Sequence, residues 1–145
     1  MTLRQRDESG TAVRILVVDD YSPWHDFVSS TLNKEPGWEV IGSVSDGLAA
    51  VDQAQQLKPD LILLDIGLPT LNGIQAATRI RETSPCSKIL FVSENRSLDV
   101  AESALNTGAM GYVIKSDAGA ELVPAIKAVL QGKRFVSARL ARHFL

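Results

Sequence analysis

Residues 13–20 read VRILVVDD, and this stretch decides the fold. A short, nearly continuous apolar run such as Val13–Val18 is typical of a strand that is buried on both faces of a parallel sheet. The pair Ser22-Pro23 follows two residues after the aspartates, and it is typical of a helix start because proline fits the first helical position. The predicted domain therefore begins with a strand, an acidic turn and a helix.

The same alternation continues to about residue 131. Four more apolar runs predict strands, at residues 38–44, 61–64, 88–92 and 110–114. Amphipathic stretches predict helices at residues 22–33, 47–57, 74–83, 97–106 and 118–131. Five short strands alternating with five helices predict right-handed βαβ connections. We therefore expect an α/β fold, a doubly wound (βα)5 domain with a five-stranded parallel sheet.

The composition fits one globular domain and excludes several classes of protein. The chain has 145 residues, of which 45% are hydrophobic and 22% charged, with a formal net charge of -2. A net acidic chain lacks the basic surface that direct nucleic-acid binding requires, so we expect none. No apolar run approaches the ~18 residues of a membrane span, so we expect no membrane insertion. The lone Cys86 has no partner for an internal disulfide, which favours a cytoplasmic location.

Three parts of the chain are distinguished by composition. Residues 1–12 are polar, and we expect a disordered leader. Residues 13–132 hold the alternating strands and helices, and they form the predicted domain. Residues 133–145 are rich in basic side chains, and we expect a linker or a short docking segment there.

Polar side chains stand where the predicted strands end. Asp19 and Asp20 follow the first strand, Asp65 the third, Ser93 the fourth and Lys115 the fifth. In an open parallel sheet, ligands bind outside the carboxyl ends of the strands. Clustered carboxylates repel one another unless a cation lies among them, and Mg²⁺ or Mn²⁺ takes oxygen ligands of this kind. The sequence therefore predicts a metal site at this edge of the sheet.

Each of these side chains has a role that its chemistry suggests. A carboxylate can form an aspartyl-phosphate, so Asp65 is the candidate nucleophile and shares the metal with Asp19 and Asp20. The backbone carbonyl of Gly67 is a candidate fourth ligand. Lys115 would pair with one phosphate oxygen, and Ser93 would hydrogen-bond another. Taken singly, Asp19-Asp20 could cap the first helix and Ser93 could be an ordinary loop hydroxyl; the set of residues together favours the site.

Four stretches resemble the receiver domain of two-component response regulators, over roughly residues 13–136. They are ILVVDD at 15–20, LDIGLP at 64–69 with Asn72-Gly73, FVS at 91–93 and GYVIK at 111–115. The resemblance implies a flavodoxin-like sheet in the order 2-1-3-4-5. It also implies a sensor histidine kinase or phosphotransfer protein as phosphoryl donor, and no turnover of a separate substrate.

The resemblance further implies a switch. Ser93 would move toward the phosphate and Tyr112 would rotate inward, which reshapes the face formed by the fourth helix, fifth strand and fifth helix. An aromatic residue in a strand can equally be a packing residue. Residues 111–136 resemble the NarL/FixJ subclass, which implies an output partner or a fused DNA-binding domain outside this chain, and a possible homodimer.

Two departures from the simplest interpretation leave alternatives open. Glu94 follows Ser93 where the family often has a small residue, and its charge would repel an anionic donor. This keeps open a receiver-shaped interaction module that works without phosphorylation. A Mg²⁺-dependent aspartyl phosphatase is the other alternative, but such enzymes resemble a pattern with a second acid two residues after the first aspartate. Here Tyr21 and Ser22 stand two residues after Asp19 and Asp20.

Overall fold

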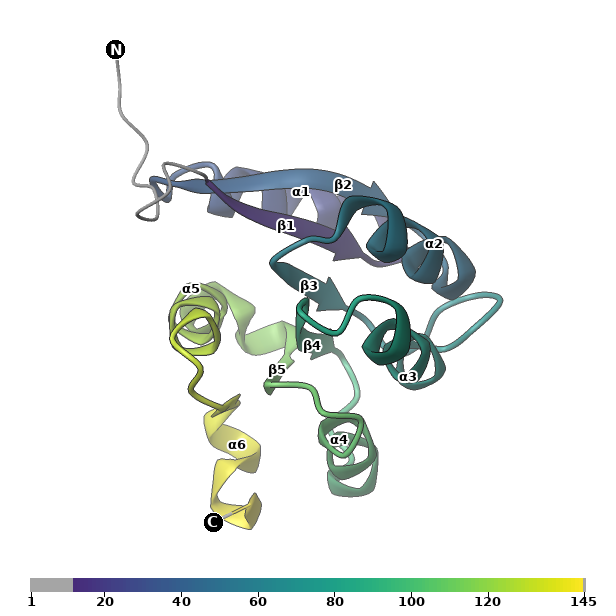
Figure 1. Ribbon diagram of the computed structural model, residues 1–145. Coiled ribbons are helices and arrows are strands. Elements are labelled where there is room, and N and C mark those ends of the chain that lie inside the picture. The colour runs from purple at the N-terminus through teal and green to yellow at the C-terminus, as the bar shows by residue number, and fades with distance from the viewer. Residues whose placement is uncertain (1–11, 145) are drawn as a thin grey trace.

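A computed structural model describes residues 12–144, which form one parallel sheet covered by helices on both faces (Figure 1). The strands are β1 (Val13–Val18), β2 (Trp38–Val44), β3 (Leu61–Leu64), β4 (Lys88–Ser93), β5 (Gly111–Ile114) and β6 (Phe135–Val136). The helices are α1 (Ser22–Leu32), α2 (Gly47–Leu57), α3 (Gly73–Thr83), α4 (Leu98–Leu105), α5 (Ala118–Leu130) and α6 (Ala138–Ala141), with short 3-10 turns η1 (Lys115–Asp117) and η2 (Arg142–Phe144).

The sheet has six strands rather than the five expected from the sequence. Their order is β2-β1-β3-β4-β5-β6, so the expected order of the first five strands is confirmed and β6 is added at one edge. β6 runs parallel to β5, with Tyr112 opposite Val136. Two residues are too few to show a strand period, and the basic Lys133-Arg134 before them favoured a linker or a short docking segment instead. The sheet therefore extends beyond residue 132.

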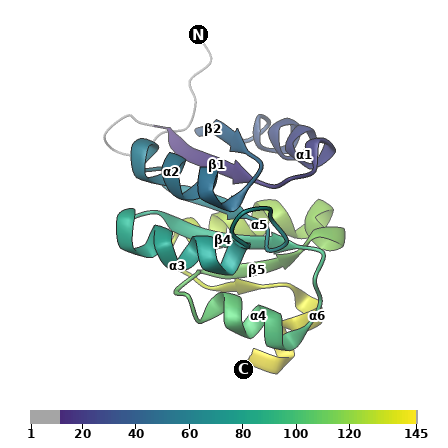
Figure 2. The ribbon, with the colours of Figure 1, turned by 90° about the vertical axis from the view of Figure 1, so that its right-hand side faces the viewer.

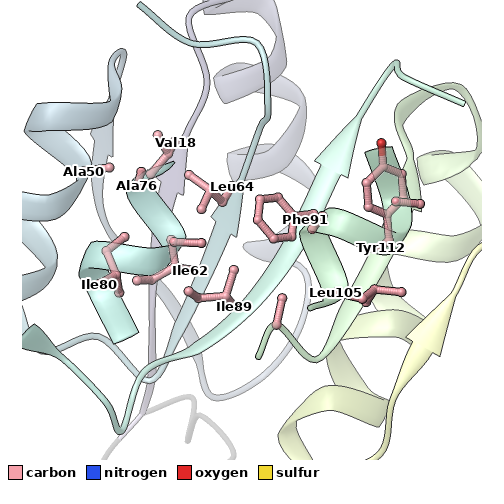
Figure 3. Close-up of a cluster of buried hydrophobic side chains, with 14 of the residues drawn as sticks. Val18, Ala50, Ile62, Leu64, Ala76, Ile80, Ile89, Phe91, Leu105 and Tyr112 are labelled. Carbon is pink, nitrogen blue, oxygen red and sulfur yellow. The ribbon is translucent and has the colours of Figure 1, made fainter. Parts of the chain in front are cut away.

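Strand residues alternate between the two faces of the sheet, because successive side chains of a strand point in opposite directions. Leu16 and Val18 belong to one buried cluster, and Ile15 and Val17 belong to the other. α2, α3 and α4 cover the first cluster, whereas α1 and α5 cover the second (Figures 1 and 2). Figure 3 shows the first cluster, in which the ring of Tyr112 lies near Leu105 and Phe91.

Local sequence fixes the ends of the helices near the edge where the polar residues lie. Asp46 caps α2 by accepting a hydrogen bond from the Ala49 amide at 2.9 Å. Asn72 and Gln75 form a reciprocal capping box at the start of α3. Within residues 12–144, no helix has the length and apolar content to cross a membrane.

Candidate functional site

Three carboxylates meet at the carboxyl edge of the sheet. Asp19 and Asp20 follow β1, Asp65 follows β3, and one oxygen from each lies within 4.8 Å of the others. Asp19 is 1% exposed and Asp65 is 8% exposed, whereas Asp20 is exposed to solvent. Neighbouring parallel strands end at the same edge, so the sequence pattern was sufficient to bring these residues together.

Lys115 is the cation of this cluster. It follows β5, and its Nζ lies 2.6 Å from Asp19 Oδ2 and 3.6 Å from Asp65 Oδ2. Burial by itself lowers the pKa of Lys115, but the hydrogen bond to Asp19 and the charge of Asp65 outweigh it and raise the pKa above its ordinary value. Lys115 therefore stays an ammonium group at neutral pH. We call Asp19, Asp20, Asp65 and Lys115 the acidic pocket.

Asp65 is held in an environment that disfavours its charge. Burial raises the pKa of its carboxyl group, and the charges of Asp19 and Asp20 raise it further. Lys115 and the Ile66 amide, which donates to Asp65 Oδ1 at 2.7 Å, act in the opposite direction and do not compensate. Three carboxylates with one ammonium leave negative charge unbalanced, and a divalent cation fits such a donor set.

Gly73 allows the start of α3 to pack against the backbone of Asp65. A Cβ at this position would lie 1.9 Å from the carbonyl oxygen of Asp65, so no other residue fits. The Gly73 amide donates to the Ile66 carbonyl at 2.7 Å. Sequence reasoning did not assign this role, and the only signal for it was the glycine after the helix cap Asn72.

The side chains of Ser93 and Tyr112 both form hydrogen bonds with the backbone of Asn95. Ser93 is buried at the end of β4, and its Oγ accepts a hydrogen bond from the Asn95 amide at 3.1 Å. The Tyr112 hydroxyl donates to the Asn95 carbonyl at 2.6 Å. Burial raises the pKa of Tyr112, against the hydrogen-bonding effect of the Ser93 hydroxyl. The Tyr112 ring thus lies inward, in the apolar cluster (Figure 3).

Two clefts open onto Asp65. One, of about 390 Å³, is lined by Asp65, Gly67 and Ser93, and Glu94 is also part of its wall. The other, of about 500 Å³, is lined by Asp20, Asp65, Glu94 and Lys115, together with aromatic residues. Glu94 is exposed and borders both clefts, so its charge lies beside both approaches to Asp65.

Two residues of α1 support the pocket and were not assigned to it from the sequence. The ring of Trp24 lies under Lys115, with Nζ 5.1 Å from the ring centroid, a cation–π arrangement. His25 Nε2 lies 2.5 Å from the backbone oxygen of Asp19. Both residues stand in the first turn of the helix after Asp19-Asp20, and this closeness along the chain was the only signal available.

Comparison with known protein families identifies this arrangement. The profile of the response regulator receiver domain matches residues 15–127, most of the chain. The chain belongs to the response regulator receiver family. The resemblance stated from the sequence is therefore confirmed, as is the general function: a receiver domain is a phosphoacceptor signalling module.

Individual relatives agree with this assignment. The response regulator GacA of Pseudomonas viridiflava is 31% identical over 130 residues, which cover 90% of this chain and 61% of GacA. A LuxR-family two-component response regulator from Aurantimonas sp. SI85-9A1 is 32% identical with a TM-score of 0.86, over 91% of this chain and 94% of that structure. The receiver domain of a putative response regulator NarL from Mycobacterium tuberculosis is 28% identical with a TM-score of 0.80, over 85% and 99%. The chain spans less than two thirds of the length of the curated relatives DegU and GacA.

Proposed function

We propose that Asp65 is the phosphoacceptor of this receiver domain. The observation that carries the proposal is the environment of Asp65: its carboxylate is buried at the junction of two clefts, beside Lys115 and two further carboxylates. An oxygen of Asp65 would attack the phosphorus of a phosphohistidine. The new P–O bond forms as the P–N bond breaks, and the imidazole nitrogen keeps the electron pair and takes up a proton.

Asp19, Asp20 and Asp65 would hold Mg²⁺ or Mn²⁺, and the carbonyl of Gly67 would be a further ligand. The three carboxylates fit such an ion because their oxygens converge and their charge exceeds that of Lys115. When bound, the metal supplies positive charge that offsets the repulsion between the carboxylate and an incoming phosphoryl group.

Lys115 and Ser93 would bind the transferred phosphoryl group. Lys115 Nζ already lies 3.6 Å from Asp65 Oδ2, so little movement brings it to an oxygen of a phosphate on that atom. Ser93 Oγ accepts a hydrogen bond from Asn95 and still has a proton to donate. Attack of water on the phosphorus would break the P–O bond to Asp65, release inorganic phosphate and restore the free carboxylate. The domain would thus act on its own phosphoryl group, and we expect no turnover of a separate substrate.

Tyr112 would couple phosphorylation of Asp65 to the face formed by α4, β5 and α5, because its hydroxyl and the Ser93 hydroxyl both hydrogen-bond to the backbone of Asn95. The donor would be a sensor histidine kinase or a phosphotransfer protein in the cytoplasm. The recipient would be an output partner, a DNA-binding domain outside this chain or a second copy of the domain. The GacA relative, with about two fifths of its length outside the match, supports a fused output domain.

Intact-mass measurement with a small phosphoryl donor tests this function. The protein is incubated with Mg²⁺ and acetyl phosphate, beside the Asp65→Asn variant and an EDTA-treated sample. We expect the gain of one phosphoryl group in the native protein alone. No gain in any sample, also with Glu94→Ala, would favour the module that works without phosphorylation. A gain with Glu94→Ala alone would identify Glu94 as the barrier to the donor.

A further inference from the structure

The face formed by α4, β5 and α5 is covered by the chain itself. Residues 135–144, which we call the C-terminal segment, add β6 to the sheet edge and continue as α6 beside α4 and α5 (Figures 1 and 2). We propose that the docking of this segment depends on whether Asp65 is phosphorylated, and that phosphorylation strengthens the docking. The inference rests on the proposed function and adds to it the intramolecular partner of the switching face.

Ser137 anchors the segment with a complete set of hydrogen bonds. Its side chain is fully buried, and its Oγ accepts from the Ile114 amide at 2.8 Å and donates to Glu121 Oε1 at 2.5 Å. Its own amide donates to the Tyr112 carbonyl at 2.9 Å. The Ala138 amide donates to Glu121 Oε2 at 3.0 Å. Buried polar groups that are paired in this way specify one docked position, because any displacement leaves them unpaired.

Apolar contacts hold the rest of the segment. Leu140 is 5% exposed and belongs to the same buried cluster as Tyr112 and Leu105. Val136 and Phe144 pack against that cluster from the outside. At β5, Gly111 makes room for β6, since a Cβ there would lie 2.5 Å from the Phe135 carbonyl oxygen. The segment is thus part of the core on which the Tyr112 ring packs.

Two routes join the acidic pocket to the segment. In the first, Ser93 and Tyr112 share the backbone of Asn95, and the Tyr112 carbonyl accepts the Ser137 amide. The second runs through η1, which begins at Lys115 and ends at Asp117. Asp117 Oδ2 accepts from Arg139 Nε of the segment at 2.8 Å. A displacement of Ser93 or of Lys115 would therefore also displace a residue that contacts the segment.

The inward ring of Tyr112 sets the direction of the coupling. In this structure the segment is docked while Tyr112 lies in the cluster that Leu140 completes. A Ser93 hydroxyl that donates to a phosphate oxygen can still accept the Asn95 amide, so it holds in place the Asn95 carbonyl to which the inward Tyr112 donates. Phosphorylation then favours the docked segment as well. Because coupling between two equilibria is reciprocal, a chain whose segment is undocked must bind a phosphoryl mimic more weakly, by the same factor by which that mimic strengthens docking.

Amide hydrogen exchange of the full chain tests the coupling. Exchange at Ile114, Ser137 and Ala138 is followed by NMR with Mg²⁺ alone and with Mg²⁺ plus beryllofluoride, whose binding is checked by fluorine NMR. We expect these amides to exchange at least about 5-fold more slowly with beryllofluoride bound, the lower end of common allosteric couplings. The Asp65→Asn variant should show no change. Equal or faster exchange while beryllofluoride is bound would overturn the inference and leave the proposed function intact; failure of beryllofluoride to bind would overturn the proposed function itself.

Substitutions in the segment test the reciprocal effect. Leu140→Ala should weaken beryllofluoride binding, at most by the factor by which beryllofluoride slows exchange in the native protein, whereas Leu130→Ala, which packs against the opposite cluster, should not. Glu121→Gln removes one acceptor from the Ser137 network at little change in volume, and it serves if Leu140→Ala does not fold. Unchanged beryllofluoride affinity in a folded variant whose segment amides exchange as fast as unprotected amides would contradict the coupling.

Discussion

The acidic pocket and the C-terminal segment both adjoin β5, but their polar groups are satisfied to different degrees. In the pocket, two buried carboxylates and an exposed one share a single ammonium group, and burial raises the pKa of Asp65. In the segment, the buried Ser137 has a donor and an acceptor, and Glu121 uses both of its oxygens. The difference indicates that the pocket is built to gain a ligand, whereas the segment is built to hold one docked position.

Leu140→Ala should produce the largest change in stability, because it removes the main apolar contact of the segment. Truncating a buried leucine costs about 2–5 kcal/mol of the free energy of unfolding. We expect a loss of about 2–3 kcal/mol, measured by urea denaturation. Leu98→Ala is the matched control, since Leu98 is 39% exposed, and it should cost far less. Equal effects of the two substitutions would mean that the segment adds little to the core.

Asp20→Asn should weaken Mg²⁺ binding with little effect on the fold, because Asp20 is exposed and lies in the carboxylate cluster that we propose holds the metal. Removing a unit charge beside a divalent ion costs more than about 1.4 kcal/mol, which is about a tenfold or greater loss of affinity. Isothermal titration measures it, with Asp99→Asn on α4 as the control for loss of one exposed acid. Unchanged affinity would remove Asp20 from the proposed ligand set.

Asp65→Asn should stabilise the metal-free protein at neutral pH. Because the pKa of Asp65 is raised in the folded state, that state binds the proton more tightly than the unfolded chain does. The stability of the native protein therefore falls as pH rises from the ordinary aspartate pKa through the raised one, and the variant lacks this decline. Above that window we expect a gain of about 1 kcal/mol, common for single stabilising substitutions. Thermal denaturation in EDTA across pH measures it; parallel curves would show that burial of Asp65 carries no such cost.

Arg139→Ala should have the smallest effect. Its side chain is 55% exposed and pairs with Asp117 at 2.8 Å. Exposed ion pairs contribute little to stability, so we expect a loss in the free energy of unfolding far below that of Leu140→Ala, measured by urea denaturation. A loss as large as that of Leu140→Ala would show that the ion pair, rather than the apolar contact, holds the segment.

The same contrast explains what the sequence could predict. Asp19, Asp20, Asp65 and Lys115 each follow an apolar run, and parallel strands must end at one edge of the sheet. Strand period and topology were therefore enough to bring them together.

The segment could not be predicted in that way. Phe135-Val136 is too short to show a strand period. The burial of Ser137 depends on Glu121, sixteen residues away, as its acceptor. The contact between Trp24 and Lys115 likewise joins α1 to the residue that follows β5, which is far away along the chain. Contacts of this kind arise only when the elements are assembled.

Locating the phosphoryl group on the chain tests the central claim most directly. The protein phosphorylated with acetyl phosphate and Mg²⁺ is reduced with borohydride, which converts an acyl phosphate on aspartate to homoserine, and peptide sequencing by mass spectrometry finds the modified position. We predict homoserine at position 65 and at neither 19 nor 20. Homoserine at position 19 or 20, or label that borohydride does not reduce, would contradict the assignment of Asp65 as the phosphoacceptor.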